Sequence, residues 1–195
     1  MRRLEAEFGD RVSLDWRSFL LRPRPRERSR PGDLEKFRAY TQSWRRPAAD
    51  PDSGHFQVWQ GDAGPPSHSI PPHLVAKAAA SLGEGEFRRM QDRLFAAYFS
   101  ESRDITDDAT LRALWREAEL PAAEFERSQD LALLRETVQE HHAAQAAGAT
   151  GVPAVQLVGN DVVIVGAHPL ELYQRWLNKT LAARAAETES EAAEA

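Results

Sequence analysis

The stretch from residue 148 to residue 167 constrains the fold of this chain more than any other. It reads Gly-Ala-Thr-Gly-Val-Pro-Ala-Val-Gln-Leu-Val-Gly-Asn-Asp-Val-Val-Ile-Val-Gly-Ala. Gly148 is placed to end a helix, and the Gly-Asn-Asp run at 159–161 tolerates the positive φ angles of a tight turn. The pattern predicts a β-hairpin with strands over 153–158 and 162–165. Both strands are nearly all apolar, as in a sheet that helices cover on both faces.

The rest of the chain is dominated by helical patterns, with one further strand. Apolar residues three or four apart predict five helices before the hairpin: one capped by Asp33, one over 72–82, one over 85–100, one capped by Thr106 or Asp107, and one from about 121 to 147. A closing helix begins near His168 and keeps its apolar stripe as far as Leu181. At the start of the chain, Leu4 and Phe8 predict a short helix. The alternation that follows predicts a strand over 12–19.

Composition allows one domain with room for an insertion. Of 195 residues, 42% are hydrophobic and 28% are charged, which is the balance of a globular protein. Residues 22–31 interleave arginine with proline, which precludes a regular helix and favours a solvated loop. That run holds no aromatic residue for base stacking and the net charge is −5, so we expect no nucleic-acid partner. Without a signal peptide or an apolar run of spanning length, we expect a cytoplasmic protein that does not contact membranes.

Little in the sequence points to catalysis by the chain itself. There is no cysteine, which removes disulfides, thiolate nucleophiles and cysteine-ligated metal sites. His141 and His142 are adjacent on a helix and face different directions, so they cannot form a metal-binding pair. Ser67 and His68 are neighbours without the surrounding motif of a nucleophile elbow. No glycine-rich phosphate loop is present, so we expect no metal and no cofactor.

The order of elements and two short motifs resemble a known family. The Gly-Val-Pro at 151–153 and the Val-Gly-Ala-His-Pro at 165–169 are similar to the C-terminal ββα unit of DsbA-like proteins of the thioredoxin superfamily, and 67–69 and 94–99 resemble its FrnE-type members. The resemblance implies an α/β, thioredoxin-like fold with a helical insertion and with the first β-strand missing.

It also implies a division of the chain. Residues 1–181 would form a single DsbA-like domain, followed by a disordered tail over 182–195. Within the domain, the helix end and strand would occupy 1–21, the helical insertion 32–147 and the ββα unit 148–181.

The same resemblance assigns a binding site but no catalytic residue. In this family the Val-Pro bond is typically cis and lies beside the redox cysteines. Gly151, Val152 and Pro153 are therefore the expected substrate-binding residues, with the backbone of Val152 facing outward to pair with an extended peptide or with glutathione. The cysteines themselves belong to a Cys-x-x-Cys motif on the missing strand and the helix start that follows it.

The missing strand has an energetic consequence. In the family it is central and pairs with the strands at 12–19 and 153–158. Without it, two rows of backbone groups stay unpaired, each at about 1–3 kcal/mol if buried, against a total stability of about 5–15 kcal/mol. Either the two strands pair directly, or a partner supplies a strand, or the natural start lies upstream of Met1. We expect the last of these.

Three functions follow from the resemblance. The first is a DsbA-family thiol–disulfide oxidoreductase homologue, truncated or inactive because it has no cysteine. The second is a glutathione-dependent relative, similar to the 2-hydroxychromene-2-carboxylate isomerases and the kappa-class glutathione transferases, many of which use serine in place of cysteine. The third is a non-catalytic, thioredoxin-like module that binds peptides. The sequence leaves these alternatives, and the oligomeric state, open.

Overall fold

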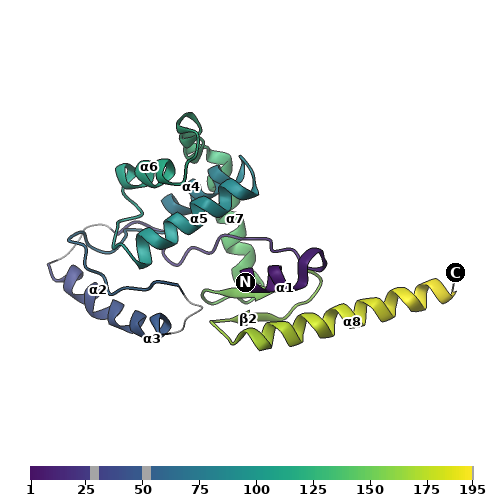
Figure 1. Ribbon diagram of the computed structural model, residues 1–195. Helices are drawn as coiled ribbons and strands as arrows, with labels where there is room; N and C mark the ends of the chain where they lie inside the picture. The colour runs from purple at the N-terminus through teal and green to yellow at the C-terminus, as the bar shows by residue number, and fades with distance from the viewer. Residues whose placement is uncertain (27–30, 50–53, 195) are drawn as a thin grey trace. The chain divides into compact units, whose positions relative to one another are not determined.

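The computed structural model describes residues 1–26, 31–49 and 54–194 (Figure 1). These residues form two compact units. The first, here called the hairpin unit, comprises Met1–Arg17 and Gln145–Ala195. The second, the helical unit, comprises Ser18–Ala144. No helix in the described part of the chain has the length and apolar character needed to cross a bilayer.

The hairpin unit is built on a two-stranded antiparallel sheet. β1 (Ala154–Gln156) pairs with β2 (Val163–Val165), so that Val155 lies opposite Ile164. The sheet packs with α1 (Arg2–Phe8) and α8 (Leu170–Glu194), and a short 3₁₀ turn, η1 (Gly9–Arg11), follows α1. The buried side chains at its centre are Leu4, Phe8, Tyr173 and Leu177. The hairpin therefore forms within the predicted ranges 153–158 and 162–165, with shorter strands, and the closing helix follows it as predicted.

The strand predicted over residues 12–19 does not form. The strands in the described residues are β1 and β2, and residues 12–19 pair with neither of them. At the end of this segment, backbone N–H groups instead bind side chains of one helix. The Ser18 N–H donates to Glu140 Oε2 (2.8 Å), and the Leu20 N–H donates to His141 Nδ1 (3.2 Å). The prediction of a strand over 12–19 was wrong, because alternation of apolar and polar residues does not show whether a second strand pairs with the segment.

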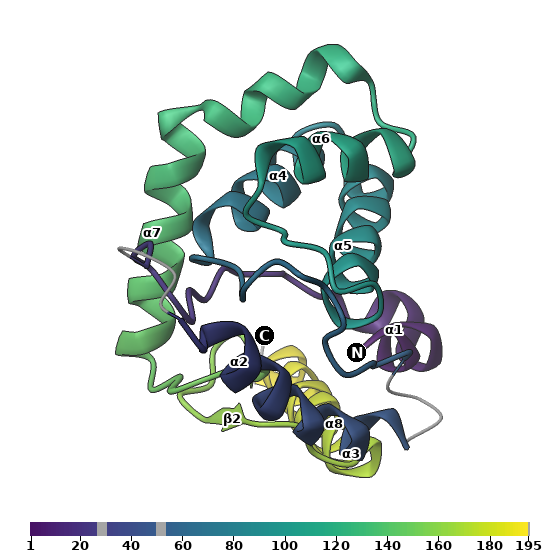
Figure 2. The same ribbon diagram turned by 90° about the vertical axis from the view of Figure 1, so that its left-hand side faces the viewer.

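In its described residues, the helical unit contains five longer helices and several short ones. Their bounds are α2 (Asp33–Thr41), η2 (Gln42–Trp44), α3 (Arg45–Ala48), α4 (Ile70–Ala80), α5 (Glu84–Phe99), α6 (Asp108–Glu117), η3 (Ala122–Gln129) and α7 (Leu131–Ala146). α4 packs against α5 and η3, and α5 packs against α6. The neighbouring helices α4, α5 and α6 can be followed in both views (Figures 1 and 2). Asp107 begins α6 as predicted, by accepting a hydrogen bond from the Thr110 N–H at 2.8 Å.

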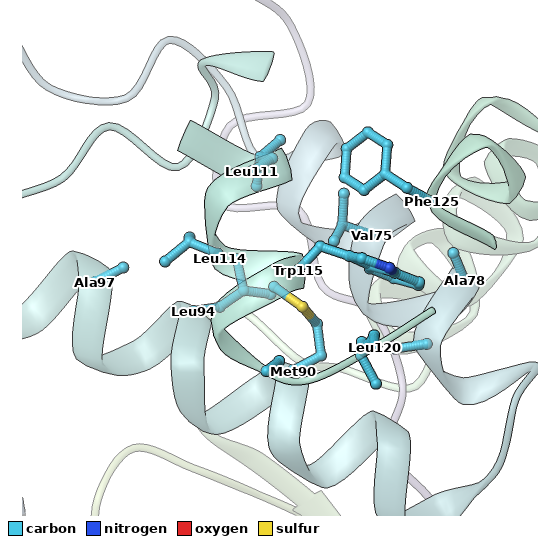
Figure 3. Close-up of a cluster of buried hydrophobic side chains, with 12 residues drawn as sticks. Val75, Ala78, Met90, Leu94, Ala97, Leu111, Leu114, Trp115, Leu120 and Phe125 are labelled. Atoms are coloured by element: carbon cyan, nitrogen blue, oxygen red, sulfur yellow. The ribbon is translucent and has the colours of Figure 1, made fainter. Parts of the chain in front are cut away.

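One apolar core holds α4, α5, α6 and η3 together (Figure 3). Trp115 is 1% exposed at its centre, packs edge-on against Phe125, and donates its indole N–H to the Pro121 carbonyl at 2.9 Å. Because the indole nitrogen has this partner, the largest side chain of the cluster is buried without an unsatisfied polar atom. The other core members are Val75, Ala78, Ala79, Met90, Leu94, Ala97, Leu111, Leu114, Ala118 and Leu120.

Some element boundaries differ from the expectation. The single helix predicted over 121–147 is two elements, η3 and α7, separated at Asp130, whose carboxylate accepts the Ala132 N–H at 2.8 Å. Asp33 was predicted to cap α2, but it is the first residue of the helix, and the capping residue is Gly32, with φ 85°. The tail predicted to be disordered continues α8 as far as Glu194. Part of the predicted arginine-proline loop, residues 27–30, lies outside the described residues, as does residue 195.

Candidate functional site

Gly151, Val152 and Pro153, the residues expected to bind substrate, lie between α7 and β1. The chain turns after α7 at Gly148, whose φ of 98° is readily adopted only by glycine. The Val152–Pro153 peptide bond is cis, the geometry that the family resemblance implies. Val152 is 49% exposed and Pro153 is exposed, so both residues are open to a ligand.

The register of the hairpin determines which backbone groups of β1 are already used. The Pro153 carbonyl accepts the Gly166 N–H at 2.8 Å, and two residues along, Val155 faces Ile164. In an antiparallel pair, successive residues turn their N–H and C=O groups alternately toward and away from the partner strand. Residues 153 and 155 therefore turn their hydrogen-bonding groups toward β2, and Pro153 contributes only its carbonyl because proline has no N–H.

Ala154 and Gln156 consequently turn their backbone groups away from β2. These two residues and Val152 have no backbone–backbone hydrogen bond to any other described residue beyond the ladder itself. Ala154 and Gln156 are also exposed. The outer side of β1 is thus an open strand edge, here called the β1 edge, with unpaired donors and acceptors.

Hydrogen bonds at the end of β2 hold the other side of the hairpin in place. His168 Nε2 lies 3.1 Å from the Val165 carbonyl, and the Tyr173 hydroxyl donates to the Gly166 carbonyl at 3.4 Å. Burial raises the pKa of Tyr173, so its hydroxyl stays protonated and remains a donor at neutral pH. These contacts fix β2, and through it β1, without occupying the β1 edge.

Polar residues of the helical unit form a second cluster, which sequence reasoning missed. Glu140 accepts hydrogen bonds from the Ser18 N–H (2.8 Å) and from Lys77 Nζ (2.9 Å), while Lys77 also contacts Glu136 at 2.7 Å. Burial alone would raise the pKa of Glu140, but the hydrogen bonds from Lys77 and Ser18 outweigh it and lower the pKa. His73, beside them, has its pKa lowered, chiefly by burial and then by the charge of Lys77. The cluster anchors the segment at residue 18, and we assign it a structural role.

The structure brings Ser67 and His68 into contact but does not complete a catalytic triad. Ser67 Oγ lies 2.7 Å from His68 Nδ1. Asp104 is near enough to influence the pKa of His68, which burial lowers and Asp104 raises, but its Oδ1 accepts hydrogen bonds from Thr106. Among the described residues no carboxylate is hydrogen-bonded to His68. The pair therefore lacks the third group that would orient the imidazole.

The described residues also hold no group of three or more histidine, aspartate or glutamate side chains arranged to bind a metal ion. The chain offers no thiolate, because it has no cysteine, and the residues that the structure describes hold no assembled nucleophile. What the hairpin unit does offer is main-chain hydrogen bonding along the β1 edge. This arrangement suits non-covalent recognition of an extended segment.

Comparison with known protein families identifies a relationship. The family model described as the DSBA-like thioredoxin domain matches residues 67–178, more than half of the 195-residue chain. The matched region contains the Gly-Val-Pro segment, the hairpin and most of the helical unit. A search of curated proteins found no match.

Proposed function

Because the chain belongs to the DSBA-like thioredoxin domain family, we propose that it is a homologue of the DsbA-type thiol–disulfide oxidoreductases, of the FrnE type, that binds an extended peptide or glutathione at Gly151, Val152 and Pro153. The motifs at 151–153 and 165–169 support the DsbA-like relationship, and the resemblance of 67–69 and 94–99 supports the FrnE assignment. The chain contains no cysteine, so any thiol that the function requires must come from another molecule or from outside these 195 residues.

The observation that carries the proposal is the open β1 edge. An extended ligand that aligns with it gains backbone hydrogen bonds at Ala154 and Gln156, and Val152 extends the same exposed run. Each such bond is worth about 0.5–1.5 kcal/mol net, so affinity accumulates with the length of the paired segment. A longer peptide is favoured over the tripeptide glutathione on this ground, since glutathione has too few backbone groups to reach along the whole edge.

Proline at position 154 provides a direct test of binding at the β1 edge. Ala154→Pro removes an N–H that faces away from β2, a position where an edge strand accepts proline. We expect fluorescein-labelled, reduced and alkylated insulin B chain to bind this variant at least tenfold more weakly than the unmodified protein in fluorescence anisotropy. Ala154→Val keeps the N–H and is the matched control, with an expected change of less than twofold.

The other outcomes of that titration are equally informative. Equal binding of the B chain to Ala154→Pro and to the unmodified protein would exclude the β1 edge as the site, provided that circular dichroism shows both proteins folded. If reduced glutathione binds in calorimetry while the B chain does not, the relationship to glutathione-dependent isomerases and transferases becomes the better description.

Thiol exchange is the second test of the proposal. We expect the chain to give no reductase turnover in the insulin-turbidity assay with dithiothreitol, because attack on a disulfide requires a thiolate. Thioredoxin added to the same mixture should restore precipitation and so shows that the assay responds. A rate above the dithiothreitol background, proportional to the concentration of the chain, would contradict the proposal.

A further inference from the structure

The β1 edge lacks the features that usually protect a strand edge from pairing with another chain. Residues 151–158 contain no charged side chain, whereas lysine on an edge strand is a common protection. Pro153 does not protect this edge, because its nitrogen and carbonyl face β2, where the carbonyl accepts the Gly166 N–H at 2.8 Å. Two copies of this chain can therefore bring their β1 edges together without repulsion between charges.

Two exposed valines lie at the ends of the β1 edge. Val152 is 49% exposed, and Val158, two residues after the end of β1, is 85% exposed. Between them, Val155 and Leu157 pack against the buried side chains of the hairpin unit. Since successive residues of a strand face opposite sides of the sheet, continuing the alternation puts Val152 and Val158 on the other face. The hairpin unit leaves this apolar surface open to solvent.

The β1 edge is complementary to itself in one antiparallel register. When Val155 of one copy faces Val155 of a second copy, Ala154 of each lies opposite Gln156 of the other. Their outward N–H and C=O groups then form hydrogen-bonded pairs, in which the two residues exchange two backbone hydrogen bonds. Two residues further out, Val152 of each copy faces Val158 of the other. One register thus pairs the open backbone groups and also brings the exposed valines together.

We propose that the β1 edge binds a second copy of this chain, by antiparallel pairing of the two β1 strands about Val155. The pairing joins two hairpins into a four-stranded sheet, which is favourable because a two-stranded sheet is only marginally stable alone. This inference rests on the proposed function in one respect, since both require the β1 edge to be open. An extended peptide and the second copy use the same backbone groups, so each excludes the other.

Sedimentation equilibrium tests the self-association. The average mass of the unmodified chain should rise from that of a monomer toward that of a dimer as the concentration increases about a hundredfold. Val158→Lys should raise the dissociation constant of the dimer about tenfold, because it puts a charge where the valines meet. Val162→Lys is the matched control. Val162 is 56% exposed in the same hairpin but lies just before β2, so the expected change is less than about twofold.

Engineered cysteines test the register, and a chain without native cysteine suits this test. Under mild oxidation, Ala154→Cys mixed with Gln156→Cys should form disulfide-linked dimers about fivefold faster than either variant alone. The reason is that the register puts positions 154 and 156 opposite each other, at the Cα separation of about 5.5 Å that a disulfide spans. Identical positions lie diagonally, about 7–8 Å apart.

The outcomes separate self-pairing from the proposed peptide binding. A chain that stays monomeric at every concentration overturns self-pairing, and so does a dimer that Val158→Lys leaves unchanged and whose cysteine variants gain nothing from mixing. The proposed function survives either result if the insulin B chain still binds. A dimer that the B chain dissociates supports both proposals. A dimer with the expected register that the B chain neither binds nor dissociates supports self-pairing and contradicts the peptide proposal.

Discussion

Leu114→Ala should destabilise the helical unit by about 3–5 kcal/mol. Leu114 is 0% exposed in the core that joins α4, α5 and α6, so truncating it removes buried apolar surface and leaves a cavity that its neighbours cannot fully fill. Because the total stability of a domain is about 5–15 kcal/mol, this loss approaches the stability of the unit itself. Chemical denaturation followed by tryptophan fluorescence measures it, since Trp115 lies in the same core.

Leu131→Ala makes the same chemical change on the surface of the same unit. Leu131 is 63% exposed at the start of α7, so we expect a loss of less than about 0.5 kcal/mol. Similar losses at Leu114 and Leu131 would show that the cluster around Trp115 is not the stabilising core.

Glu140→Gln should cost about 2–3 kcal/mol, because it removes the buried charge that accepts hydrogen bonds from Lys77 and the Ser18 N–H. The loss is smaller than for a fully isolated buried pair, since Lys77 keeps its contact with Glu136. Glu136 is the matched control. Its side chain is 52% exposed, and Glu136→Gln should cost less than about 1 kcal/mol.

The same substitution should also change the acid sensitivity of the protein. The pKa of Glu140 is lowered on folding, so its contribution is present above the ordinary glutamate value of about 4.3 and is lost as the pH falls below it. The pKa of His73 is also lowered on folding, so the stability of the folded protein decreases further as the pH falls below the ordinary histidine value of about 6.5. Denaturation midpoints measured from pH 7 to pH 3 should fall steeply in the unmodified protein and less steeply below pH 4.5 in Glu140→Gln. Parallel curves for the two proteins would contradict this assignment.

The sequence could predict those features that depend on residues close together in the chain. The hairpin follows from glycine and apolar residues within a span of twenty, and the helices follow from spacings of three and four. Residues 12–19 show the limit of this reasoning. Their alternation of apolar and polar residues is typical of a strand, but a strand forms only where a second strand pairs with it. The segment instead ends on side chains of α7, more than a hundred residues away.

The candidate sites divide in the same way. Gly151, Val152 and Pro153 could be named from a local motif. The cluster around Glu140 could not, because its members come from distant segments and each one alone is an ordinary polar residue. The hydrogen bond from the Ser18 N–H to Glu140 joins residues 122 positions apart, so no local pattern could predict it.

The composition of the β1 edge also bears on how such a chain changes over evolutionary time. The edge consists of main-chain groups, and every residue except proline carries the same N–H and C=O. Substitutions at positions 154 and 156 therefore leave the hydrogen-bonding pattern intact unless they introduce proline. The side chains of this edge are free to change while the main-chain groups that an extended strand would meet stay the same.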